Sequence, residues 1–159
     1  MTNVEHLSVE TCLSLLEQHR LGRLGVVDDE GPLVLPVNYV LDRGSVVLRS
    51  DPGLKLDLAN QHAAAAFEID GVDHTRRLGW SVVVRGRLTQ VTDADERERL
   101  SSQGLAPYVG GDKAHLVRLD SRSISGRRIV VPPDVPADRL HAVALSNVWL
   151  GRDGDDLLA

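Results

Sequence analysis

Between residues 23 and 50 the chain repeats one pattern, an apolar run rich in Val and Leu followed by a tight turn. RLGVV (23–27) precedes DDEG, PLVLPVNYVL (32–41) precedes DRG, and SVVLRS (45–50) follows that turn directly. β-branched and aliphatic runs bounded by Gly, Asp and Pro are typical of strands. Because the connecting turns are so short, the pattern predicts consecutive antiparallel hairpins.

Three later segments also predict strands. AAAAFEID (63–70) is rich in Ala, but its end alternates apolar and acidic residues as a strand does. WSVVVRGRLTQV (80–91) is the strongest strand pattern, with Gly86 expected to mark a bulge, and residues 113–129 also alternate. Residues 71–79 are expected to form a loop. About six strands without a repeated β-α-β order predict a mainly β protein, a six-stranded antiparallel barrel with peripheral helices.

Three short helices are predicted around these strands. Ser8 is a suitable N-cap for the amphipathic run VETCLSLLEQHR, and Gly22 is expected to end that helix. The pair Asp51–Pro52, with Asp as N-cap and Pro at the first helical position, predicts a second helix that ends near Asn60. Residues 93–103 are predicted to form an exposed, charged helix.

Length and charge limit the function classes. The 159 residues predict one domain (1–129) and a Pro-rich, acidic tail (130–159) that is loosely packed or lies on a partner chain. A net charge of −5 lacks the electrostatic footprint of a protein that binds nucleic acid or anionic lipid. Neither a signal-peptide pattern nor an apolar run of about 20 residues is present, so we expect a soluble, cytoplasmic protein. Cys12, the single cysteine, allows no intrachain disulfide and is expected in the core.

Several familiar catalytic and binding motifs are missing from the sequence. It contains neither a G-x-G-x-x-G dinucleotide fingerprint nor a G-x-x-x-x-G-K-[ST] phosphate loop. Gly79, Trp80 and Ser81 begin a nucleophile elbow, but Val83 stands where the closing Gly should be. The six histidines have no spacing typical of a metal site. We therefore assign no catalytic residue and predict no metal.

The stretch LRSDPGLKL places a guanidinium, a hydroxyl and an ammonium around one turn: Arg49, Ser50 and Lys55. Arg offers a planar fork for phosphate oxygens, Lys a point charge, and Ser a hydroxyl donor. The helix dipole disfavours a cation in the first turn by roughly 0.3–1 kcal/mol, and a bound anion would remove that conflict. The alternative is that the three residues are simply solvated at a loop.

The order and spacing of GRLGVV, PLVLPVNYVLDRGSVVLRSDPGLKL, AAFEID and GWSVVVRGRLTQV resemble the pyridoxamine 5′-phosphate oxidase-like family. Members of this family are FMN-binding split β-barrels, and the small bacterial branch that this chain resembles includes nitroimidazole-reductase-like proteins. The resemblance runs from about residue 8 to residue 129. It implies an obligate homodimer with FMN in each of two clefts at the interface.

The resemblance also implies which residues contact the cofactor. By position, it assigns the FMN phosphate to Arg49, Ser50 and Lys55, the isoalloxazine ring to Val37 and Asn38, and the ring and ribityl chain to Trp80 and Ser81. Alternatives stay open for two of these residues: core or interface packing for Trp80, and ordinary core packing for Val37. A flavin-dependent oxidoreductase acting on a small molecule by hydride transfer is the leading interpretation.

The chain also departs from the oxidase pattern. The oxidase has an Arg-x-His element near its C-terminus that grips pyridoxal phosphate, whereas the comparable region here reads SISGRRI. Lys55 stands alone where the oxidase has an Arg-Lys pair. Oxidation of pyridoxamine phosphate is therefore not expected. A non-catalytic dimer that stores or senses a flavin, F420 or haem is the alternative, since some relatives bind F420 or haem instead of FMN.

Overall fold

The computed structural model describes residues 3–73, 78–105 and 115–130. Within these ranges the chain forms seven strands and three helices. In chain order the elements are β1 (Asn3–Leu7), α1 (Val9–Gln18), β2 (Leu21–Asp28), β3 (Gly31–Asp42), β4 (Ser45–Ser50), α2 (Leu54–Asn60), β5 (Ala64–Asp73), β6 (Leu78–Val91), α3 (Ala94–Ser101) and β7 (His115–Val130).

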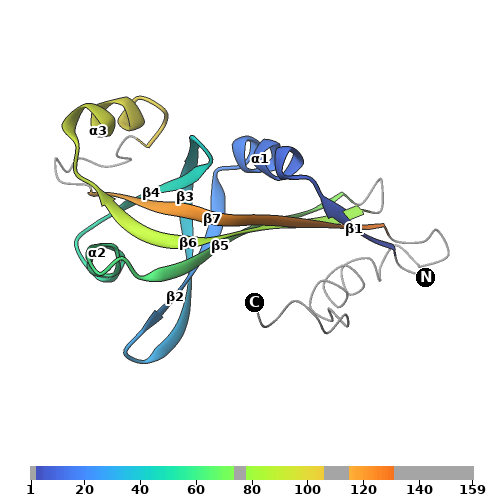
Figure 1. Cartoon of the computed structure of the whole chain (residues 1–159), viewed down its shortest axis with the longest axis horizontal. Helices are drawn as coiled ribbons and strands as arrows, with labels where there is room; N and C mark the ends of the chain where they lie inside the picture. The colour runs from blue at the N-terminus through green and yellow to red at the C-terminus, as the bar shows by residue number, and fades with distance from the viewer. Residues whose placement is uncertain (1–2, 74–77, 106–114, 131–159) are drawn as a thin grey trace.

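Six of the strands close an antiparallel barrel (Figure 1). Each strand pairs with the next in the order β7, β4, β3, β2, β5 and β6, and the β6–β7 pairing completes the circle. This confirms the predicted mainly β fold and the six-stranded barrel. The prediction omitted a seventh strand, β1, which pairs with the end of β7 beyond the part that β4 occupies.

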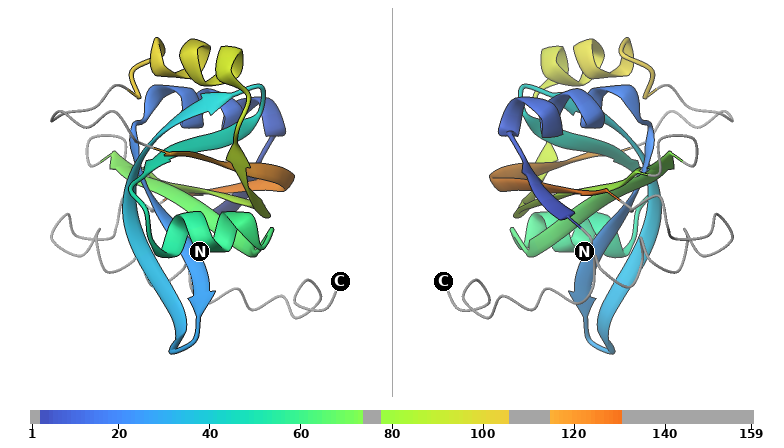
Figure 2. Two further views of the ribbon diagram at one scale, coloured as in Figure 1. Left: turned by 90° about the vertical axis from the view of Figure 1, so that its left-hand side faces the viewer. Right: turned by 90° about the vertical axis from the view of Figure 1, so that its right-hand side faces the viewer.

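The barrel interior holds the main apolar core. Inward-facing side chains from all six barrel strands belong to it, including Tyr39 and Phe67, whose rings meet edge to face at 4.7 Å. Cys12 of α1 and Leu58 of α2 also join this core, which confirms the predicted position of the cysteine. Figure 2 shows α1 and α2 on opposite sides of the barrel strands. The helices therefore cover the barrel from two sides.

A second, smaller apolar cluster lies on the outer face of the barrel wall. Val40 of β3 and Val47 of β4 pack there against Leu100 of α3 and Leu105 just after it. Successive side chains of a strand point to opposite faces, so β3 and β4 supply both the interior core and this outer cluster. This outer packing holds α3 against the β3–β4 hairpin.

Two glycines explain local features of the strands. The β6–β7 register shifts between Arg85 and Gly86, as the predicted bulge requires, and a side chain at Gly86 would collide with the Asp120 carbonyl. The expectation for Gly22 was wrong. Helix α1 ends at Gln18, and Gly22 lies inside β2, where a Cβ atom would run into the ring of Phe67. A glycine is needed at position 22 because the Phe67 ring packs directly against β2 there, and not because a helix ends at this residue.

The starts of helices α1 and α2 are set by their N-cap residues. The Ser8 hydroxyl accepts from the Thr11 N–H, which confirms the predicted cap of α1. Helix α2 begins later than predicted: its N-cap is Gly53, with φ of 139°, and not Asp51. Such a φ is accessible to glycine but not to Asp or Pro, so the chain makes its turn at Gly53 before the helix can start. The predicted end at Asn60 is confirmed.

The loop predicted at 71–79 is shorter than expected, because β5 runs to Asp73 and β6 begins at Leu78. Its middle, 74–77, lies outside the described residues, as do 106–114 and the tail from 131 onward. The division into a domain (1–129) and a tail (130–159) therefore stays a prediction. No helix in the described part of the chain has the length and apolar character needed to cross a membrane.

Candidate ligand-binding pocket

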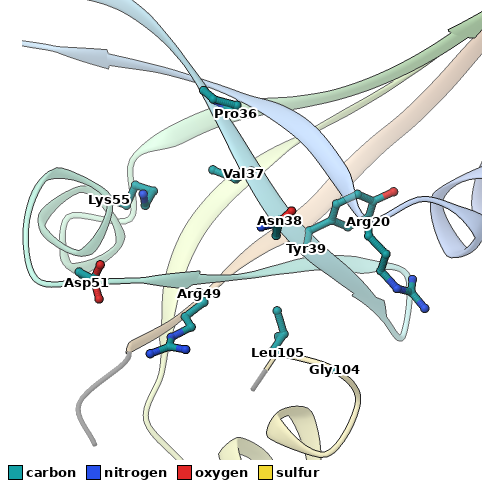
Figure 3. Close-up of a pocket in the computed structure, with 10 residues that line it drawn as sticks. All are labelled: Arg20, Pro36, Val37, Asn38, Tyr39, Arg49, Asp51, Lys55, Gly104 and Leu105. Carbon is teal, nitrogen blue, oxygen red and sulfur yellow. The ribbon is translucent and has the colours of Figure 1, made fainter. Parts of the chain in front are cut away.

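A pocket of about 750 Å³ opens on the outer side of the barrel wall (Figure 3). This volume falls within the range of about 300–1,000 Å³ found for small-molecule sites. Strand β3 provides its floor, and residues of β4, α2 and the segment after α3 line its sides. Its described lining residues are Arg20, Pro36, Val37, Asn38, Tyr39, Arg49, Asp51, Lys55, Gly104 and Leu105.

The pocket is rich in positive charge although the chain as a whole is acidic. Its described lining residues include three cations, Arg20, Arg49 and Lys55, and one carboxylate, Asp51. Among the described residues, neither the Arg49 guanidinium nor the Lys55 ammonium has an ion-pair or hydrogen-bond partner. Burying two cations partly without counterions is unfavourable unless an anion or water molecules bind to them. The arrangement therefore suits an anionic ligand.

The alternation of β4 aims Arg49 at the pocket. Leu48 and Ser50 face the barrel interior, whereas Val47 and Arg49 face outward. Arg49 is the last outward residue of this strand, and Lys55 lies in the first turn of α2; both residues line the pocket. The structure thus brings together four of the seven residues predicted to contact a cofactor: Val37, Asn38, Arg49 and Lys55.

The other three predicted residues, Ser50, Trp80 and Ser81, lie outside this lining. Ser50 is buried, and its hydroxyl donates to the Asp51 carbonyl at 2.8 Å. Trp80 packs against the interior core and meets His19 edge to face at 4.9 Å. Ser81 is buried in β6. Their assignment to a cofactor stays a prediction from the family resemblance alone.

Arg20 and Tyr39 line the pocket although sequence reasoning did not select them. The Tyr39 N–H donates to the Arg20 carbonyl at 3.0 Å, which continues the β2–β3 pairing into the segment before β2. The Tyr39 hydroxyl points into the core and donates to the Leu16 carbonyl at 2.8 Å. Burial raises the pKa of Tyr39 to about 12, so this phenol stays protonated and structural. The only signal for Arg20 was a cation directly before a strand.

A partly buried ion cluster, centred on Asp42, holds the part of the pocket wall that follows α3. Arg99 of α3 donates to both oxygens of Asp42, at 2.7 and 3.1 Å, and Arg118 of β7 donates to the same carboxylate at 3.0 Å. Arg118 also donates to Glu96 at 2.6 Å. Hydrogen bonds from Arg99, and then Arg118, lower the pKa of Asp42 to about 2 despite its burial. The cluster ties α3 to the β3–β4 hairpin and thereby positions Leu105.

The chemistry of the lining is that of binding rather than of nucleophilic catalysis. Its described residues include no Cys, Ser, Thr or His, and the Tyr39 hydroxyl is committed to the core. Within the described ranges, no group of three His, Cys, Asp or Glu side chains is arranged to hold a metal ion. Any redox or transfer chemistry in this pocket would therefore depend on a bound cofactor.

Comparison with known proteins places this barrel in a family. The family model described as pyridoxamine 5′-phosphate oxidase matches residues 8–128. The chain belongs to this family. This confirms the resemblance that the sequence motifs predicted, and it covers both sides of the pocket, from Arg20 to Leu105.

Individual proteins resemble the chain over most of its length. The uncharacterized protein Rv0080 of Mycobacterium tuberculosis is 30% identical over 138 residues, which are 84% of this chain and 90% of that protein. The solved FAD binding protein from Mycobacterium smegmatis is 30% identical, with a TM-score of 0.69, covering 80% of this chain and 100% of that one. The conserved protein DIP1874 from Corynebacterium diphtheriae is 32% identical, with a TM-score of 0.68, covering 80% and 98%.

Proposed function

We propose that this protein binds a flavin, with FMN as the cofactor, in the pocket over β3. In this proposal Arg49 and Lys55 hold the phosphate, and Val37 and Asn38 lie along the isoalloxazine ring. The observation that carries it is a pair of cations, without partners among the described residues, that line a pocket of about 750 Å³. The name of the M. smegmatis relative, an FAD binding protein, supports a flavin as the ligand class.

The proposed activity is that of an oxidoreductase acting on a small molecule. A bound flavin supplies hydride transfer at its N5. The chain's own residues bind and orient it: the cations anchor its charged end, and the apolar Val37 and Leu105 exclude water from the side of the ring. Pyridoxamine phosphate oxidation is not part of the proposal, because SISGRRI replaces the residues that would grip that substrate.

We also propose a homodimer that buries the outer face of the β2–β3 hairpin. Cross-strand partners share a face, so Val27 lies beside Pro32 and Gly25 beside Val34 on this side. Leu21, Val27 and Val34 are each 63% exposed there, and the hairpin projects beyond the barrel (Figure 2). The same face continues into Pro36 and Asn38 of the pocket. A second copy seated on this face would therefore also cover the pocket.

The phosphate site is tested by comparing FMN with riboflavin, which lacks the phosphate. One charge-assisted hydrogen bond is worth roughly 1.5–3 kcal/mol, so we expect Lys55→Gln to weaken FMN binding about tenfold or more and to leave riboflavin binding unchanged. Arg85→Gln is the matched control, because Arg85 is exposed on β6 outside the described lining. Calorimetric titration measures both affinities. Wild-type protein that binds neither flavin would refute the proposed function.

Binding without turnover is the second candidate function. The replacement of the oxidase's substrate-gripping element by SISGRRI favours it, because that element is what would hold a substrate against the flavin. Oxidation of NADH or NADPH by the FMN-loaded protein with any small acceptor would exclude it. A visible spectrum and mass of the cofactor released after purification from the native host would separate FMN from F420 and haem.

A further inference from the structure

Arg20 lies on the far side of the pocket from the two proposed phosphate ligands. In Figure 3, Lys55 and Arg20 stand at opposite ends of the lining, with Asn38 between them. The backbone of Arg20 is anchored to the pocket floor, since its carbonyl accepts from the Tyr39 N–H at 3.0 Å. The next residue, Leu21, pairs with Asn38 in the β2–β3 ladder. The position of Arg20 is therefore set by the barrel.

The guanidinium of Arg20 is oriented but not neutralised. Its Nη1 donates to the Glu17 carbonyl at 2.9 Å and to the His19 carbonyl at 3.2 Å, both at the end of α1. These carbonyls hold the group in place without cancelling its charge. In the described part of the chain no carboxylate pairs with it, and its Nε and Nη2 donors have no acceptor. A full positive charge thus remains at this end of the pocket.

Charge at the two ends acts differently on the two redox states of a flavin. The phosphate carries the same charge in both states, so Arg49 and Lys55 bind both equally. The charge of the ring, in contrast, changes on reduction. Addition of a hydride from a reductant, which is two electrons and one proton, converts the neutral oxidised ring into an anion. A cation beside the ring binds that anion more tightly than the neutral ring, and this raises the reduction potential.

We infer that Arg20 sets the redox potential of the bound flavin by stabilising its reduced, anionic ring. This rests on the proposed function, because it takes Arg49 and Lys55 as the phosphate site and so places the ring toward Arg20. Arg20 tunes the potential through its charge. It does not anchor the cofactor, and it donates no proton.

The test is the midpoint potential of FMN bound to the protein, measured by dithionite titration against a reference dye. We expect Arg20→Gln to bind oxidised FMN as wild type does but to bind reduced FMN at least tenfold more weakly. For a two-electron couple this lowers the potential by about 30 mV. Arg20→Lys keeps the charge and should retain most of the wild-type potential. Arg85→Gln controls for the loss of a distant surface charge.

The outcomes separate this inference from the proposed function. If wild-type protein binds no FMN, the proposed function fails. If FMN binds and Arg20→Gln leaves its potential within a few millivolts of wild type, the inference about Arg20 is wrong and the proposed function stands. Equal weakening of oxidised and reduced FMN by Arg20→Gln would also overturn it, because Arg20 would then be a phosphate ligand. Lys55→Gln should lower the affinity for both states and leave the potential unchanged.

Discussion

Replacing Asp42 by Asn should destabilise the protein strongly, because this carboxylate is the buried centre of the ion cluster. Its side chain is only 4% exposed and accepts from both Arg99 and Arg118. The hydrogen bonds from Arg99 and Arg118 lower its pKa from 3.8 to about 2, so folding favours the charged form of this carboxyl over the protonated form. At about 1.4 kcal/mol per unit, that difference corresponds to roughly 2–3 kcal/mol.

We expect an observed loss near the lower end of that range, about 2 kcal/mol. Arg99 is about one third exposed, so solvent screens its part of the interaction, and Arg118 keeps Glu96 as a partner. For a chain of this size the loss should lower the melting temperature by about 4–8 °C. Urea unfolding at pH 7 and constant protein concentration measures the free energy directly.

The effect of pH provides a second check on the same reasoning. A carboxyl whose pKa is depressed in the folded state stabilises the protein above its unfolded pKa, here 3.8. That stabilisation is lost as the pH falls toward the folded pKa of about 2. The difference between wild type and Asp42→Asn should therefore be constant from pH 7 to about 5 and should shrink steadily below pH 4.

Asp70 offers a matched control. It accepts from Arg23 at 2.7 Å, the same distance as the shorter Arg99–Asp42 contact, but its side chain is 40% exposed. Exposed ion pairs contribute about 0–1 kcal/mol, so Asp70→Asn should change the free energy of unfolding by less than 1 kcal/mol. Equal losses for Asp70→Asn and Asp42→Asn, or a difference at Asp42 that persists unchanged at low pH, would refute the argument from burial.

Two further predictions concern the barrel and its exposed hairpin. Gly22→Ala should destabilise the protein by about 1–3 kcal/mol or more, because the added methyl group meets the Phe67 ring inside a packed core; chemical denaturation measures this, and an unchanged midpoint would contradict it. Val34→Asp should shift the chain from dimer to monomer in analytical ultracentrifugation, because it places a charge at the centre of the proposed interface. The same substitution should leave the fold intact by circular dichroism, since Val34 is 63% exposed in the single chain.

The strands and hairpins followed from the sequence because they depend on local patterns. Each barrel strand alternates around inward-facing residues such as Leu48 and Phe67, and short turns fix the order of pairing. Strand β1 was missed because NVEHL is short and its partner, Gly126–Val130, lies more than a hundred residues away. A strand that forms only by pairing with a segment distant in the sequence, here the end of β7, leaves no signal in its own local sequence.

The candidate site was predictable only in part, and for the same physical reason. Arg49 and Lys55 stand out because they are close in sequence and flank one turn, so local reasoning groups them. Arg20 reaches the same pocket through the pairing of its carbonyl with Tyr39, which is a property of the barrel register. Trp80 was assigned from family position, yet its ring packs against the core and His19. The local sequence around a residue does not show whether its side chain will line the pocket or pack against the core.

The pocket has one rigid boundary and one replaceable boundary. Its floor is β3, whose Tyr39 and Val37 belong to the barrel core, so a change of shape there would disturb the interior packing of the whole domain. Another boundary, at Gly104 and Leu105, follows a peripheral helix that side-chain contacts hold in place. Evolution can therefore exchange that helix and its flanking segment while retaining the strand. Divergent ligand preferences on this scaffold should accumulate on the helix side of the opening.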